Sequence, residues 1–225
     1  MREKNRRHYY NLQLEEAEKI RESGRRPSLL MHTCCAMCAC YPIGYLSEIF
    51  DLTLFYYNDN IYPESEYEKR YSELERYVGI YNSTHPHQVR LIKNPYHGDE
   101  YREKMIPYKD SPEGGERCTV CFDMRMDASM KYAEDNHYDY FTTVMTVSRQ
   151  KDSRRLNEIG EILQKKHPGV RYFFSDFKKD GGLEKAAEII RKYDIYRQNY
   201  CGCVYSYGEM LERARREFKA DHNHQ

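Results

Sequence analysis

The sequence predicts an α/β protein in which a Rossmann-like parallel sheet of about five strands carries helices on both faces. Short apolar runs that suit β-strands alternate with longer amphipathic segments along nearly the whole chain. This alternation is typical of strand–helix–strand crossovers, which build parallel sheets covered on both sides. No linker rich in Pro, Gly or Ser divides the 225 residues, so we expect a single α/β domain.

Local patterns place the elements in order along the chain. Strands are expected where apolar, aromatic and β-branched residues run together, at residues 28–32, 52–57, 89–92, 140–144 and 170–174. Helices are expected where apolar residues recur every three or four positions, at residues 10–23, 42–50, 64–81, 118–136, 156–165, 183–193 and 205–219. Pro42 is placed at the start of its helix, where no intrahelical bond is lost. Residues 93–117 hold three prolines and three glycines, and so long a connection is usually functional or mobile.

Composition and charge exclude several classes of protein. Lys and Arg number 36, as do Asp and Glu, so the net charge of zero does not indicate a nucleic-acid binder. Two basic clusters near the ends are more typical of a solvated surface than of a phosphate site: Arg2, Lys4, Arg6 and Arg7, and Arg213, Arg215, Arg216 and Lys219. No apolar run approaches the ~18 residues of a membrane span, and no signal peptide is evident. We therefore expect a cytoplasmic protein without a membrane partner, whose cysteines stay reduced.

Two pairs of cysteines predict a metal centre. Cys34 and Cys35 directly follow the first strand, at the kind of turn where open α/β sheets bind ligands. Cys118 and Cys121 begin a helix, whose dipole favours thiolates. Adjacent cysteines suit a multi-iron cluster better than one zinc ion, whose paired ligands are generally two to four residues apart. The two pairs supply the four thiolates of a 4Fe–4S cluster, and a zinc site with four thiolates that staples the long loop is the alternative.

The remaining cysteines lie outside that set of four. Cys201-Gly202-Cys203 can form a strained, readily reduced disulfide, or can be a pair of inert turn thiols. Cys38 and Cys40 are candidates for a second metal or a redox role, or are simply small buried side chains. The glycine-rich loops that bind ATP or NAD do not occur in the chain.

Six blocks of sequence resemble the cobalamin-independent epoxyqueuosine reductase (QueH) family. The blocks run in order through the chain: Leu30-Met31-His32-Thr33-Cys34-Cys35-Ala36-x-Cys38, Phe55-Tyr56-Tyr57-Asn58-x-Asn60-Ile61-x-Pro63, Gly115-Glu116-Arg117-Cys118-x-x-Cys121-Phe122, Asp139-Tyr140-Phe141-Thr142-Thr143, Ser175-Asp176-Phe177-Lys178-Lys179, and Tyr196-Arg197-Gln198-x-Tyr200-Cys201-Gly202-Cys203. On this basis the chain divides into an N-terminal helical extension (1–26), a family core (28–207) and a C-terminal helix (208–225).

The resemblance implies the last step of queuosine biosynthesis, reduction of epoxyqueuosine to queuosine at the wobble position of tRNA. It implies a fold related to the adenine-nucleotide α-hydrolase-like proteins and a 4Fe–4S cluster, without cobalamin. The cluster ligands would be Cys34, Cys35, Cys118 and Cys121, and a second, mononuclear metal (iron) would lie beside the cluster at Cys38. The partners would be tRNA carrying epoxyqueuosine and an external electron donor.

Further residues complete the predicted site. The Cys201/Cys203 pair would store two electrons as dithiol and disulfide, and Asp59, or Tyr57, would protonate the leaving oxygen. Basic residues in loops near the carboxyl edge of the sheet would bind tRNA: Arg149, Lys151, Lys178, Lys179 and Arg197. Two alternatives remain open, a tRNA-sulfurating enzyme of related fold and a non-catalytic, zinc-stapled RNA-binding module. The first should carry a pyrophosphate-binding Ser-Gly-Gly motif where this chain has Cys34-Cys35-Ala36.

Overall fold

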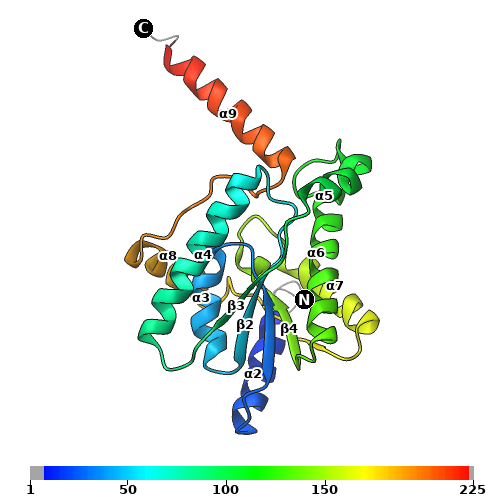
Figure 1. Cartoon of the computed structure of the whole chain (residues 1–225), viewed down its shortest axis with the longest axis vertical. Helices are drawn as coiled ribbons and strands as arrows, with labels where there is room; N and C mark the ends of the chain where they lie inside the picture. The colour runs from blue at the N-terminus through cyan, green and yellow to red at the C-terminus, as the bar shows by residue number, and fades with distance from the viewer. Residues whose placement is uncertain (1–7, 223–225) are drawn as a thin grey trace.

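The computed structural model describes residues 8–222, with side chains to residue 219. Its helices and strands alternate as predicted (Figure 1). In chain order they are α2 (His8–Glu22), β1 (Ser28–His32), α3 (Ala36–Ser47), β2 (Asp51–Tyr56), α4 (Glu64–Thr84), β3 (Arg90–Lys93), α5 (Gly98–Met105), the 3₁₀ helix η1 (Ile106–Tyr108), α6 (Glu116–Asp135), β4 (Tyr140–Thr143), the 3₁₀ helix η2 (Val144–Val147), α7 (Ser153–Lys166), β5 (Arg171–Tyr172), α8 (Gly182–Lys192) and α9 (Val204–His222).

The five strands form one parallel sheet in the order β3-β2-β1-β4-β5. The central strand β1 pairs with β2 on one side and β4 on the other, so that Met31 lies opposite both Leu54 and Thr142. This is the strand order of a Rossmann-like sheet. The fold class expected from the alternation of elements is therefore confirmed.

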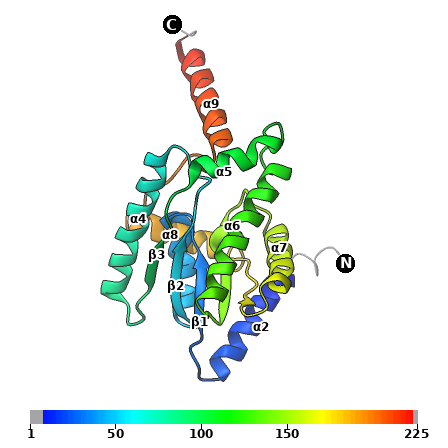
Figure 2. The ribbon, with the colours of Figure 1, turned by 45° about the vertical axis from the view of Figure 1, so that its right-hand side comes forward.

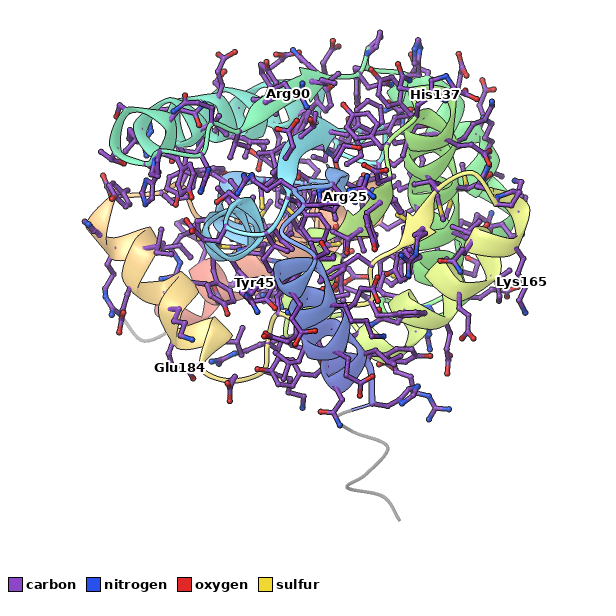
Figure 3. All side chains as sticks on the ribbon, turned by 90° about the horizontal axis from the view of Figure 1, so that it is seen from below. Arg25, Tyr45, Arg90, His137, Lys165 and Glu184 are labelled. Atoms are coloured by element: carbon purple, nitrogen blue, oxygen red, sulfur yellow. The ribbon has the colours of Figure 1, made fainter. Side chains whose placement is uncertain are left out.

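Each face of the sheet is covered by its own helices. Leu29 and Met31 pack into the core that α3, α4 and α8 complete, whereas Leu30 packs into the core with α6 and α7. Successive side chains of a strand point to opposite faces, which explains why the central strand is apolar throughout. Viewed from below, Glu184 of α8 and Lys165 of α7 lie on opposite sides of the molecule (Figure 3).

The predicted start of α3 and the predicted length of β5 were wrong, and most other boundaries differ from the prediction by one to three residues. α3 begins at Ala36, not at Pro42, because Cys35 in extended backbone already serves as its N-cap. Pro42 lies inside the helix, where it lacks the N–H that would bond the carbonyl of Cys38. β5 is confined to Arg171–Tyr172, shorter than the five residues expected.

The N-terminal helix is part of the main core. Ala17 and Ile20 of α2 are buried, and the Gln13 side chain accepts a hydrogen bond from the Asp176 N–H at 2.8 Å. The basic cluster predicted at residues 2–7 lies outside the described residues. None of the helices among residues 8–222 is long and apolar enough to cross a membrane. The division into one domain with helical ends stays a prediction.

Candidate active site

The carboxyl end of β1 lies at the switch point of the sheet. After β1 the chain crosses to β2, whereas β4 lies on the other side of β1, so the loops that follow these strands diverge. His32, the last residue of β1, connects the strands at this point. Its Nε2 donates to the carbonyl of Tyr57 at 3.2 Å, so its Nδ1 accepts from the Thr143 hydroxyl at 2.9 Å. Complete burial lowers the pKa of His32 to about 3, and the ring is a neutral structural support.

Three thiols converge in the turn after β1. The Sγ atoms of Cys34, Cys35 and Cys38 all lie within 4.8 Å of one another, and all three residues are buried. Within residues 8–222 no other group of three or more His, Cys, Asp or Glu ligand atoms is so close. The turn into α3 produces this convergence, because Cys38 lies three residues after the N-cap Cys35 and one helical turn brings it back.

The three thiols share charge unequally. The hydrogen bonds that Cys35 and Cys38 donate hold the pKa of Cys34 well below its ordinary value. The same bonds raise the pKa of Cys35 to about 12 and that of Cys38 well above the usual value, with burial adding to both shifts. Cys34 is therefore the first of the three thiols to lose its proton, and the resulting thiolate is the form that binds a metal ion.

Gln198 contacts this group from the far end of the chain. Its Nε2 donates to Cys35 Sγ at 3.0 Å, while its Oε1 is buried without a hydrogen-bond partner. No local sequence pattern predicts a role for Gln198. The only sequence signal for this residue is its place in the block Tyr196–Cys203, which resembles the family as a block and does not single out Gln198.

The Cys201–Cys203 turn is fixed by a buried arginine of α4. Arg70 is 1% exposed and pairs with Glu66, with 2.8 Å between Nε and Oε1. Its Nη1 donates to the carbonyl of Cys201 at 3.1 Å. Between the two cysteines, Gly202 has φ +132°, a conformation that favours glycine. All eight cysteines of the chain are free thiols in the structure, so the redox role of the pair stays a prediction.

Arg125 of α6 interacts electrostatically with Cys121 on its own helix and with Cys34 after β1. It follows Cys121 by one helical turn, is 3% exposed, and donates from Nη2 to Asn58 Oδ1 at 2.6 Å. None of the ion pairs of the described residues involves it. Burial raises the pKa of Cys121, and the charge of Arg125 opposes that rise. The same guanidinium favours the thiolate of Cys34.

Of the two α6 cysteines, only Cys121 is linked to Cys34 through the charge of Arg125. Cys118 accepts a hydrogen bond from the Gly114 N–H at 3.2 Å, and Cys121 is buried beside Arg125. Neither belongs to the compact group of Cys34, Cys35 and Cys38. Their assignment as cluster ligands stays a prediction. Helical spacing could have predicted that Arg125 lies next to Cys121, since residues four apart share one face of a helix.

A cavity of about 560 Å³ opens over the thiols. Three of the five predicted basic residues, Arg149, Lys151 and Arg197, line it. The lining also includes Cys34, Cys38, Gln198 and Cys201, and from α9 Ser206, Glu209 and Arg213. Burial alone would lower the pKa of Lys151, but the nearby Cys201 and Cys34 raise it above the usual value. The cavity thus combines reducing thiols with cations.

The other predicted residues are placed differently. Lys178 donates from Nζ to the carbonyls of Thr146 and Lys151, at 3.0 and 3.2 Å, and burial lowers its pKa. It therefore holds the loop after β4 and does not line the cavity; nor does Lys179. Asp59 is 7% exposed, accepts from the His97 N–H at 3.0 Å, and is also absent from the lining. Its role as a proton donor stays a prediction.

Comparisons with known proteins agree on one family. A family model described as "Epoxyqueuosine reductase QueH" matches residues 29–209. Relatives named "Epoxyqueuosine reductase QueH" include one from Streptococcus pyogenes serotype M1, 38% identical over 198 residues, which are 88% of this chain and 77% of the relative. The relative from Staphylococcus aureus is 40% identical over 184 residues (80% and 76%). The relative from Thermotoga maritima is 31% identical over 192 residues (83% and 93%).

Proposed function

The chain belongs to the epoxyqueuosine reductase QueH family, and we propose that it is an epoxyqueuosine reductase, an oxidoreductase that acts on tRNA. The reaction reduces the epoxide of epoxyqueuosine to the alkene of queuosine at the wobble position, the last step of queuosine biosynthesis. The observation that carries this proposal is the cavity in which Cys34, Cys38 and Cys201 meet Arg149, Lys151 and Arg197. Its thiols supply reducing chemistry, and its cations suit the phosphates of RNA.

The Cys201/Cys203 pair can supply the electrons and protons that one turnover consumes. Removing the epoxide oxygen as water consumes two electrons and two protons. Oxidation of the two thiols to a disulfide releases two electrons and two protons, and an external electron donor then restores the dithiol. Burial raises the pKa of Cys203, so its thiol keeps its proton at neutral pH and releases it when the disulfide forms.

We propose that the thiols bind a 4Fe–4S cluster through Cys34, Cys35, Cys118 and Cys121. Two observations support a bound group of negative charge with thiolate ligands. Three thiols converge in one turn, and Arg125 is buried without a carboxylate partner among the ion pairs of residues 8–222. A buried cation needs such a counter-charge. When bound, a 4Fe–4S cluster supplies one-electron transfer.

Cys38 is our candidate ligand for a second, mononuclear iron beside the cluster. Its Sγ belongs to the same convergent group as Cys34 and Cys35. A single zinc ion bound to that group is the competing assignment, and it would make the site a structural staple. Metal analysis of the anaerobically purified protein separates the two: iron supports the reductase, and zinc without iron supports an RNA-binding module.

Recognition of tRNA is assigned to the basic rim of the cavity. Arg149 and Arg197 are exposed and Lys151 is half-buried, so all three can reach phosphate oxygens. The wobble nucleoside lies in a single-stranded loop and can enter a cavity of this size without opening a duplex. Because its substrate is tRNA, we place the protein in the cytoplasm. Lys179 remains a further candidate for phosphate contact.

The function is tested on tRNA that carries epoxyqueuosine. The anaerobically purified protein is incubated with this tRNA and a chemical reductant, and the digested nucleosides are analysed by mass spectrometry. Loss of one oxygen, giving queuosine, supports the proposal. Unchanged epoxyqueuosine with iron-loaded protein would refute it, and a gain of sulfur would instead indicate the sulfurating enzyme.

A further inference from the structure

The last helix, α9, leaves the body of the protein beyond the carboxyl edge of the sheet (Figure 1, Figure 2). Residues 211–219 are all exposed, whereas the first turn of the helix is half-buried or buried. An isolated helix of this length is marginal in water. A partner for its exposed part would explain why the chain keeps this segment helical.

The base of α9 is firmly held. The Ser206 hydroxyl accepts from the Gly202 N–H at 3.3 Å, and the Tyr205 hydroxyl donates to the carbonyl of Met105 at 3.3 Å. The Tyr205 ring lies 4.2 Å from the guanidinium of Arg117. Contacts on both sides of the first turn fix the direction in which the helix projects. The exposed part is therefore carried on a rigid support.

One stripe of α9 continues the lining of the cavity. Ser206, Glu209 and Arg213 line the cavity together with Cys34 and Cys201. Their spacing of three and four residues keeps them on one helix face, and the next position on that face is Arg216. Beyond Glu209, where the helix leaves the body of the protein, the residues on this face are therefore the basic Arg213 and Arg216.

The two arginines of this stripe form no ion pair with the described residues of the protein. Among residues 8–222, neither Arg213 nor Arg216 takes part in an ion pair within 4.0 Å, although Glu209 and Glu212 stand four residues before them. Guanidinium groups bind phosphate through paired hydrogen bonds. Two unpaired guanidinium groups next to a cavity for a nucleoside therefore complement an RNA backbone.

We propose that α9 is an RNA-binding arm in which Arg213 and Arg216 contact phosphates next to the wobble nucleoside. This inference rests on the proposed function, because it takes the nucleoside in the cavity to be part of a tRNA. Ser206 and Arg216 are separated by about 15 Å along the helix axis. The arm thus extends from the rim of the cavity to nucleotides that flank the one being reduced.

Arg215 provides a matched control. It carries the same charge on the same exposed stretch, but it is rotated by about 200° from Arg213 around the helix. We would measure Kd for an anticodon stem-loop RNA over a series of salt concentrations with full-length variants. R213Q/R216Q should raise Kd on the order of tenfold and reduce the slope of log Kd against log salt by about 1.4, for two lost contacts to a single strand.

The control R215Q should keep Kd and slope close to those of the wild type, and R213K/R216K should restore most of the affinity because it restores the charges. An unchanged Kd in R213Q/R216Q, or an equal loss in R215Q, would overturn the proposal. So would a changed oligomeric state without a changed Kd, which would make α9 an interface between two copies of the chain.

The result separates the arm from the proposed function. If the wild type converts epoxyqueuosine while R213Q/R216Q binds RNA equally well, only the arm is refuted. If the wild type neither binds this RNA nor converts epoxyqueuosine, both proposals are refuted. Circular dichroism of each variant verifies that α9 remains helical.

Discussion

Replacing Gly202 by alanine should destabilise the turn that holds Cys201 and Cys203. At φ +132° an L side chain is strained by about 1–3 kcal/mol. The added Cβ would also lie 3.0 Å from Arg70 Nη1 and 3.3 Å from Ile61 Cγ1. Arg70 cannot easily retreat, since it is 1% exposed and paired with a carboxylate. The expected loss of about 1–3 kcal/mol or more corresponds to a fall in Tm of roughly 2–12 °C.

We would measure thermal unfolding and turnover of Gly202→Ala and of the wild type to check this prediction. Gly208→Ala is the matched control, because Gly208 lies in α9 and its added Cβ would meet nothing within 4 Å. That change should stabilise the helix, by about 0.5–1 kcal/mol. Turnover should fall in Gly202→Ala only. A Tm for Gly202→Ala equal to that of the wild type would refute the argument from backbone strain.

Three further predictions concern Cys38, Cys203 and the ion pair between Glu73 and Arg76 of α4. Cys38→Ser should change the metal content of the purified protein, whereas Cys40→Ser should not; equal elemental analyses would contradict this. Cys203 Sγ accepts a hydrogen bond from the Ser206 N–H of α9 at 3.5 Å, and a serine hydroxyl can accept the same bond but forms no disulfide. Cys203→Ser should therefore keep the visible absorption but stop turnover; full activity would exclude the relay. Hydrogen bonds from Arg76 lower the pKa of Glu73 from 4.5, so its stabilising charge is present above that pH and is lost as pH falls through the lowered native value. In urea unfolding, Glu73→Gln should be less stable than the wild type at pH 7 by about 0.5–1 kcal/mol, and this difference should shrink as the pH falls below 4.5; a constant difference would count against the ion pair.

The fold was largely predictable because its signals are local. The strand Ser28–His32 was placed correctly from its apolar run, and the alternation of elements predicted the parallel sheet. The predicted start of α3 at Pro42 was wrong, since the preference of proline for the first turn of a helix is a tendency that packing can override. Here Ile43 and Leu46 are fully buried, and this burial offsets the hydrogen bond lost inside the helix.

The site was only partly predictable, because its supporting contacts join distant positions. The spacing of Cys34 and Cys35 was informative by itself, since their ligand atoms must lie close together. Nothing local indicates that Gln198 donates to Cys35, or that Arg70 fixes the carbonyl of Cys201. Lys178 was assigned to tRNA from its charge and its place in a loop, and that assignment stays a prediction; its hydrogen bonds to the carbonyls of Thr146 and Lys151 could not be foreseen from the sequence.

Gln198 and Cys35 are in contact although 163 residues separate them in the chain. A ribosome adds about 5–20 residues per second, so the thiols after β1 emerge on the order of ten seconds before the segment that covers them. During that interval the nascent chain exposes three neighbouring thiols to oxidants and free metal ions, with no cavity to select among them. The cavity that could select a metal ion for these thiols therefore exists only after the segment of Gln198 has been synthesised and has packed against Cys35.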